Sequence, residues 1–172
     1  MNTLEIAGCT PLKGQFTPTG NKNAVMPMLC ASLLTNETVT LTNVPDISDV
    51  TKFSAFFESC GSEVAWDKAA ATLTVNHAKF SLAGNAAFPS HIRSSLMLIA
   101  PILLRGEKVV LDFNVTGCAL GVREIDPHIE HLVDHGVPLD RANNVVTLLP
   151  PANFTAASCW PDYASVTGTS TF

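Results

Sequence analysis

The chain has 172 residues, of which 47% are hydrophobic and only 15% are charged, and its formal net charge is -5. This length allows one domain with a sizeable core. The acidic balance argues against non-specific nucleic-acid binding, which needs a clustered basic surface. An average soluble domain has about 25% charged residues, so we expect much of the surface to be buried, in a thick core or against a partner.

No charged start followed by an apolar stretch opens the sequence, so we predict no secretory signal and a cytoplasmic protein. The longest apolar run, residues 95–104, is about half of the roughly 20 residues needed to cross a bilayer. The five cysteines are widely and irregularly spaced, which fits neither a disulfide framework nor a zinc C-x-x-C pattern. We therefore expect reduced thiols.

Residues 21–41 and 91–111 repeat one pattern, in which Leu33 of the first copy corresponds to Leu103 of the second, a shift of 70. Each copy predicts a helix with a broad apolar face, a short polar turn and a strand. Pro101 falls inside the second helix and is expected to kink it.

Residues 48–64 and 122–139 repeat a second pattern, an amphipathic helix, a terminating glycine and a strand. Gly61 and Gly136 occupy the position where a left-handed C-terminal cap is expected. Closing strands are predicted at residues 71–75 and 145–149. Each unit is thus helix, strand, helix, strand, strand, and another strand is expected before its first helix.

The shift grows from 70 to 75 between the two patterns, so about five extra residues entered the second unit after its first strand. Cys118 lies in that interval, in a turn flanked by Gly117 and Gly121 and close to Arg123. Inserted loops on a repeated scaffold often carry function. A thiol near a cation in such a turn can titrate and react, although a cysteine seen alone is more often an inert small residue.

Residues 162–172 predict the start of a third unit, and the sequence stops inside that apparent helix, so we expect a truncated domain. The expected units are residues 14–76, residues 85–150 and the start of a third at residues 158–172.

His128, His131 and His135 follow one another at spacings of three and four on a predicted helix, a spacing that can bind a divalent metal. A polar helix face is the simpler interpretation because no third ligand group is evident elsewhere in the sequence, and we assign no metal. The other four cysteines and the phenylalanines at helical spacing are interpreted as packing residues. These are Cys9, Cys30, Cys60, Cys159, Phe53, Phe56 and Phe57.

Four separated motifs, in order, resemble the enolpyruvyl transferases, and among them the UDP-N-acetylglucosamine 1-carboxyvinyltransferases of peptidoglycan synthesis. They are GNKNAVMP, IRSS, GCALGVREIDPHI and SVTG. The resemblance implies an α/β fold, an inverse α/β barrel-like domain built of repeated βαβαββ units, of which this chain would hold two and an incomplete third. It also implies a second, similar domain that this chain lacks.

The reaction implied by the resemblance joins the 3-hydroxyl of UDP-N-acetylglucosamine to C2 of phosphoenolpyruvate, protonates C3 and then expels phosphate. Cys118 would be the general acid for C3. Lys22 and Asn23 would contact phosphoenolpyruvate, and Arg93 and Arg123 the nucleotide or phosphate groups. Without the resemblance, Lys22 is most simply a solvated lysine at a helix start, where the helix dipole also favours anions. No cofactor, membrane or nucleic acid is implied.

Two segments match those that hold the UDP-sugar in this family. They consist of Arg123, Glu124, Ile125, Asp126 and Pro127, and of Tyr163, Ala164, Ser165 and Val166. The chain departs from the family pattern before the thiol, where it has Asn114 to Gly117 in place of Pro-Gly-Gly. Glu124 replaces a usual proline and Tyr163 a common lysine, which puts nucleotide affinity in doubt more than the reaction class.

Two other functions stay open at this stage. One is an inactive fragment or a UDP-sugar binding module, which the abrupt end of the chain favours. The other is a related enolpyruvyl transferase that acts on shikimate 3-phosphate, against which the cysteine loop argues. We expect no turnover from residues 1–172 alone.

Overall fold

The structure is a computed structural model of residues 1–172. It describes residues 3–6, 8–9, 11, 13–82, 88–89, 93–112, 126–143, 145–160 and 165–171, with the backbone alone at Asp112 and Pro127. No helix in this described part is long and apolar enough to cross a membrane.

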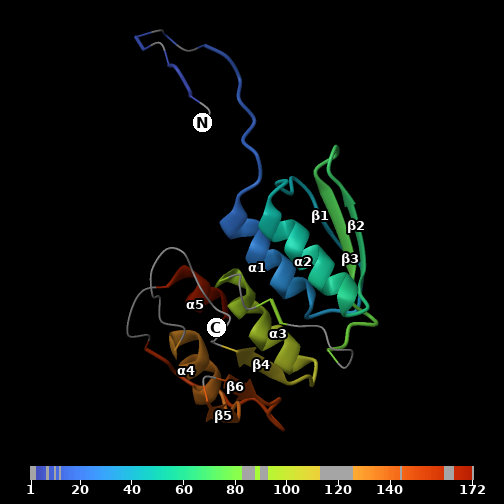
Figure 1. Ribbon diagram of the computed structural model, residues 1–172, viewed down its shortest axis with the longest axis vertical. Helices are drawn as coiled ribbons and strands as arrows, with labels where there is room; N and C mark the ends of the chain where they lie inside the picture. The colour runs from blue at the N-terminus through green and yellow to red at the C-terminus, as the bar shows by residue number, and fades with distance from the viewer. Residues whose placement is uncertain are drawn as a thin grey trace.

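Residues 21–82 form the first half of the molecule, a sheet with two helices packed side by side on it (Figure 1). Its strands have the antiparallel order β1-β3-β2, with Val39 opposite Val75 and Val64 opposite the same residue. The elements are α1 (Lys22–Ser32), β1 (Val39–Leu41), α2 (Ser48–Ser59), β2 (Glu63–Asp67) and β3 (Thr72–Asn76).

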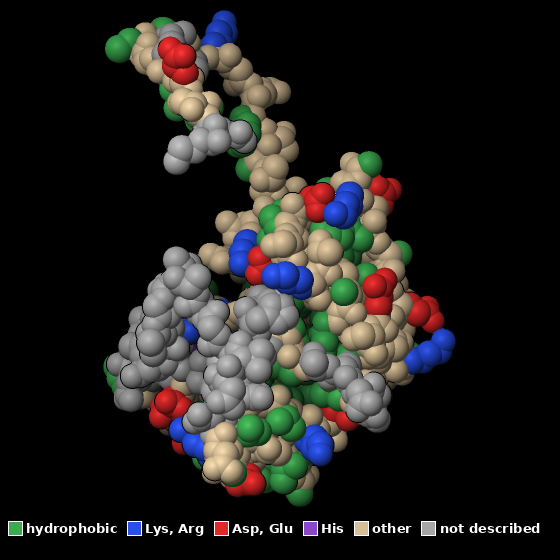
Figure 2. All heavy atoms as spheres, viewed as in Figure 1, with side chains coloured by type: hydrophobic (Ala, Val, Ile, Leu, Met, Phe, Trp, Pro, Cys, Tyr) green, Lys and Arg blue, Asp and Glu red, His purple; other side chains and the backbone are tan. Residues whose placement is uncertain are grey.

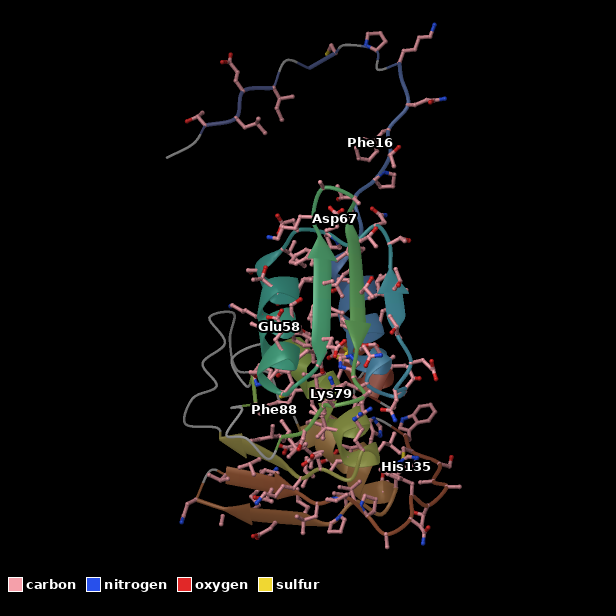
Figure 3. The ribbon with its side chains drawn as sticks, turned by 90° about the vertical axis from the view of Figure 1, so that its right-hand side faces the viewer. Phe16, Glu58, Asp67, Lys79, Phe88 and His135 are labelled. Atoms are coloured by element: carbon pink, nitrogen blue, oxygen red, sulfur yellow. The ribbon has the colours of Figure 1, made fainter. Side chains whose placement is uncertain are left out.

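Residues 93–171 form the second half, whose sheet has the order β4-β6-β5, again antiparallel. In Figure 3 the strands of the two sheets run in clearly different directions. The elements are the 3₁₀ helix η1 (Arg93–Leu98), α3 (Ile99–Leu104), β4 (Val109–Asp112), α4 (Asp126–Asp134), β5 (Leu139–Ala142), β6 (Val145–Leu148) and α5 (Val166–Thr171).

The helix ends confirm the predicted glycine caps. Gly61 has φ +89° and Gly136 has φ +88°, conformations that a side chain disfavours. Beyond each glycine a backbone N–H returns to the helix, from Ser62 to the Phe57 carbonyl at 2.9 Å and from Val137 to the Leu132 carbonyl at 3.0 Å. This pattern satisfies carbonyls that the helix leaves free.

A continuous core joins the two halves. Phe53 and Phe57 of α2 are fully buried and pack edge to face, with ring centroids 5.9 Å apart, which confirms their predicted packing role. Alternate residues of the central strands face the same core, Leu73 and Val75 of β3 in the first half. Val146 and Leu148 of β6 do so in the second half.

Arg105, directly after α3, ties the second half to the first by polar contacts. Its guanidinium donates to the Leu33 carbonyl at 2.8 Å, to Asn36 Oδ1 at 2.9 Å and to the His77 carbonyl at 2.5 Å. The ring of His77 is itself buried between two serines, with 2.9 Å from Nε2 to Ser32 Oγ and 2.7 Å from Nδ1 to Ser62 Oγ. Burial, and after it the charge of Arg105, lowers the pKa of His77 to about 4.

Three expectations about the architecture need correction. The helix expected within residues 91–104 is divided, because a 3₁₀ segment precedes α3 and Pro101 falls in the first turn of α3, where a missing N–H costs no helical bond. No strand forms among the residues described ahead of α1, since no described segment pairs with them; Figure 3 shows Phe16 there, away from the body. In the described part the strands form two small sheets rather than a closed barrel.

Candidate functional site

Six of the predicted substrate residues that the structure describes share one feature, because each lies at the first or second position of a helix. Lys22 and Asn23 begin α1, Arg93 begins η1, Asp126 and Pro127 begin α4, and Val166 begins α5 after Ser165. Backbone N–H groups at a helix start have no intrahelical acceptor and carry partial positive charge, which favours anionic ligands. The other predicted residues lie outside the described part, namely Cys118, Arg123, Glu124, Ile125, Tyr163 and Ala164.

The start of α1 is built tightly. The side chain of Asn21 caps the helix by accepting from the backbone N–H of Asn23 at 2.7 Å. Gly20 precedes it at a point where a Cβ atom would lie 1.8 Å from the Asn43 carbonyl oxygen, so only glycine fits without a shift. The segment that presents Lys22 is therefore fixed both by a cap and by close backbone packing.

Lys22 forms an ion pair with Asp49 in the first turn of α2, at 2.7 Å between Nζ and Oδ1. The lysine side chain is 52% exposed and the aspartate 20%, so the ammonium group is held at the surface and can still meet a ligand. Sequence reasoning missed Asp49. The acidic residue at a helix start was visible, but its partner 27 positions away was not.

His128 connects α4 to α5, the two helices that follow the predicted UDP-sugar segments. Its Nδ1 lies 2.8 Å from Thr171 Oγ1 and its Nε2 lies 3.2 Å from Thr167 Oγ1, so both ring nitrogens contact hydroxyls of α5. The ring is fully buried. Burial first, then the charges of Arg93 and His131, lower the pKa of His128 to about 4, which keeps the imidazole neutral at pH 7.

The helix contacts form a series. Helix α1 packs against η1, η1 packs against α5, and α5 packs against α4. Helix η1 contacts α5, and the charge of Arg93 is one of the causes that lower the pKa of His128, so the start of η1 lies near the junction of α4 and α5. The structure therefore brings Arg93 together with the segments of Asp126 and Val166, and it links Lys22 to them only through α1 and η1.

Two of the predicted residues already have partners within the chain. Asp126 accepts from Arg141 Nη2 at 2.6 Å, and both side chains are about half exposed. Ser165 caps α5, since its Oγ accepts from the Gly168 N–H at 3.1 Å. Val166 is 73% exposed.

The three histidines expected on one helix do not converge on one point, and His135 lies one residue beyond the end of α4. His128 faces α5, and His135 Nδ1 lies 2.6 Å from the carbonyl of His131. The imidazole of His131 instead lies in a group with Asp134 and Cys159, whose ligand atoms are all within 4.8 Å of one another. The expectation that no third ligand group is available to this helix is therefore wrong, because Cys159 lies next to it from a segment distant in sequence.

The cysteines outside the predicted active loop have different surroundings. All four are free thiols; Cys30 and Cys60 are buried, which confirms their packing role. Cys9 is exposed and Cys159 is half-buried, so the packing interpretation is wrong for these two. Partial burial, and then the hydrogen bond and charge of Asp134, raise the pKa of Cys159.

Comparison with known proteins places this arrangement in a family. The profile of a family described as EPSP synthase (3-phosphoshikimate 1-carboxyvinyltransferase) matches residues 6–171. A UDP-N-acetylglucosamine 1-carboxyvinyltransferase of Coprothermobacter proteolyticus is 34% identical over 169 residues, which cover 98% of this chain and 39% of that protein. One of Paracoccus denitrificans is 33% identical over 153 residues, 88% of this chain and 36% of that protein.

The fold agrees with a solved structure. The enolpyruvyl transferase NikO from Streptomyces tendae superposes with a TM-score of 0.64 at 22% identity, over 80% of this chain and 29% of that one. At this identity the likeness concerns the fold alone. The chain spans less than two fifths of the length of the relatives named above.

Proposed function

Because the chain belongs to the EPSP synthase family of enolpyruvyl transferases, we propose that it is the amino-terminal part of an enzyme that transfers enolpyruvyl from phosphoenolpyruvate to UDP-N-acetylglucosamine. The transfer would be the first committed step of peptidoglycan synthesis. The contact between α4 and α5 is the main support for this proposal, because the two segments proposed to hold the UDP-sugar lead into these two helices.

The helices that follow the two segments are in contact through His128. Pro127 directly precedes His128 on α4, and Val166 directly precedes Thr167, whose hydroxyl contacts that histidine at 3.2 Å. The first turns of α4 and α5, almost forty residues apart in sequence, are thus held in contact. This supports a single binding surface formed by residues 123–127 and 163–166, with Arg93 beside it for a phosphate group.

The reaction needs positive charge and one proton donor. Both substrates are polyanions, and we assign Lys22, Arg93 and Arg123 to their phosphate and carboxylate groups, where arginine can make two parallel hydrogen bonds. Cys118 would donate its proton to C3 as the sugar oxygen bonds to C2, and the sugar hydroxyl would lose its own proton. Loss of phosphate and of one C3 proton then restores the enol double bond. Asn23 would hold phosphoenolpyruvate next to Lys22.

We also propose that the domain is built of repeated units and continues with a second domain. Two sheets of equivalent strand order, each with its helices, support two repeated units within residues 14–76 and 85–150, of which the described part of the first is helix, strand, helix, strand, strand. Residues 158–172 would begin a third unit of an inverse α/β barrel domain. The relatives are more than twice as long as this chain, which supports a second domain that completes the site.

Thiol labelling tests the assignment of Cys118. The complete protein is treated with an epoxide analogue of phosphoenolpyruvate, with and without UDP-N-acetylglucosamine, and the modified peptide is identified by mass spectrometry. We expect modification at Cys118, and we expect its extent to differ between the samples with and without UDP-N-acetylglucosamine. Cys9 is the matched control, because it is an exposed free thiol; modification at Cys9 alone, or at no cysteine, refutes the assignment.

A second candidate is transfer to shikimate 3-phosphate, favoured by the description of the family whose profile matches. Calorimetric titration separates the candidates. We expect UDP-N-acetylglucosamine to bind and shikimate 3-phosphate not to bind, and the reverse result selects the second candidate. Binding of UDP-N-acetylglucosamine by the complete protein without turnover would instead indicate a binding module.

A further inference from the structure

We propose that His131, Asp134 and Cys159 form a binding site for a Zn²⁺ ion at the C-terminal end of α4. This site is independent of the proposed transferase reaction. It uses none of the residues assigned to phosphoenolpyruvate or the UDP-sugar.

The three ligand atoms come from two segments that meet at the end of α4. His131 and Asp134 are three positions apart on the helix, so their side chains lie on the same face. Cys159 comes from the segment that follows β6. The imidazole nitrogen, carboxylate oxygen and thiol sulfur all lie within 4.8 Å of one another.

Backbone contacts hold the second segment in place. The N–H of Thr155 donates to the His135 carbonyl at 3.0 Å, one residue beyond α4. A Cβ atom on Gly136 would lie 3.3 Å from Thr155 Oγ1, which shows how closely the segment passes the helix end. Cys159 follows four residues after this anchor, so its position next to α4 is set by more than its own side chain.

The donor set is typical of zinc. Cysteine sulfur, histidine nitrogen and carboxylate oxygen bind Zn²⁺ at about 2.3, 2.0–2.1 and 2.0–2.2 Å. At tetrahedral angles such ligands lie about 3.5 Å apart, so a separation of up to 4.8 Å needs to shrink by about 1 Å. Rotation of the exposed Asp134 side chain is able to supply much of this movement. Three protein ligands leave the fourth position to water.

The electrostatics of this helix end also favour a cation. Carbonyl groups at the end of a helix carry partial negative charge, and a cation there is stabilised. The carboxylate of Asp134 adds a full negative charge beside the thiol. A divalent ion would compensate both, and it would displace the thiol proton to form the thiolate ligand.

Cobalt substitution tests the site in the 172-residue chain. Co²⁺ bound by a thiolate gives a sulfur-to-metal charge-transfer band in the near ultraviolet, which reports cysteine ligation directly. We expect one equivalent of Co²⁺ to produce the band, and Zn²⁺ to abolish it by competition. We expect Cys159→Ser to remove the band, and Asp134→Asn to weaken Co²⁺ affinity about tenfold or more.

Two other cysteines serve as controls. Cys9→Ser removes an exposed thiol outside the cluster, and Cys118→Ser removes the thiol assigned to the transferase reaction; both variants should keep the band. A band that survives Cys159→Ser, or that disappears in either control, overturns the proposal. Cys159 and Asp134 are not fully buried, so their variants should retain the far-ultraviolet circular dichroism of the parent chain, and that spectrum is recorded for each. Zn²⁺ should raise the melting temperature of the parent chain and leave that of Cys159→Ser unchanged.

Discussion

Removal of the Arg105 side chain should weaken the attachment between the two halves of the molecule. Two of its three acceptors, the carbonyls of Leu33 and His77, belong to fully buried residues. In Arg105→Ala these carbonyls lose a charged donor, and a hydrogen bond to a charged group contributes about 1.5–3 kcal/mol. The third acceptor, Asn36, is exposed and adds little. Since such values are not additive, we expect a loss of about 3 kcal/mol in the free energy of unfolding.

Urea unfolding followed by circular dichroism measures this loss. Lys108→Ala is the matched control, because it removes one positive charge from an exposed side chain three residues away. We expect that control to change the free energy of unfolding by less than about 0.5 kcal/mol. Arg105→Lys should cost about 2 kcal/mol, because an ammonium group lacks the planar fork that reaches several acceptors. A difference of less than about 0.5 kcal/mol between Arg105→Ala and Lys108→Ala would refute the reasoning.

A second readout locates the guanidinium. The charge of Arg105 contributes, after burial, to the lowered pKa of His77. In Arg105→Ala the pKa of His77 should therefore rise from about 4 but stay below 6.5, because the burial remains. Titration of the ring by NMR measures this directly, and an unchanged pKa would mean that Arg105 does not face His77 in solution.

Three further predictions concern pH, the start of α1 and the Lys22 ion pair. The pKa values of His77 and His128 are lowered from 6.5 to about 4, so the unfolded chain binds more protons between those values. The contribution of these histidines to the free energy of unfolding should be complete above pH 6.5 and be lost as the pH falls towards 4, by about 2 kcal/mol per histidine after a discount for solvent screening. A urea midpoint that is no lower at pH 4.5 than at pH 7 would contradict this. Gly20→Ala should lower the free energy of unfolding by about 1–3 kcal/mol because the new Cβ meets the Asn43 carbonyl, whereas Gly8→Ala, with open space around it, should not. Lys22→Gln should weaken calorimetric binding of phosphoenolpyruvate by the complete protein about tenfold or more. Lys68→Gln is the control, because Lys68 is as exposed as Lys22 and also pairs with an aspartate, Asp46, and it should leave this binding unchanged.

The parts of the fold that were predictable depend on local chemistry. Gly61 and Gly136 follow amphipathic helices, and a left-handed cap needs only the residues on either side of it. The closing strands predicted at residues 71–75 and 145–149 occur as β3 and β6 with bounds that differ by one residue. Alternation of side chains along a strand depends only on the strand itself.

The parts that were not predictable depend on pairs far apart in the chain. The Lys22–Asp49 pair spans 27 positions, and the meeting of Cys159 with His131 spans 28. No periodicity in a single sequence records which loop passes which helix end. His128, His131 and His135 show the consequence, since their spacing suggests one metal site, whereas the neighbouring elements give each imidazole a different environment.

The proposed affinity for two polyanionic substrates has to arise locally, because the chain as a whole carries a net charge of -5. On the face drawn in Figure 2, Lys and Arg side chains stand among Asp and Glu side chains and form no broad basic patch. Charges separated by more than about 10 Å are largely screened at 0.1 M salt, so distant acidic residues have little effect on a ligand at the helix starts. At the start of α1 the ammonium group of Lys22, which also pairs with Asp49, and the partial charge of the backbone N–H groups act in the same direction, and Arg93 adds a guanidinium at the start of the short 3₁₀ helix η1. An acidic protein can in this way bind phosphate groups selectively while repelling nucleic acid, whose many phosphates would also meet the negative remainder of the surface.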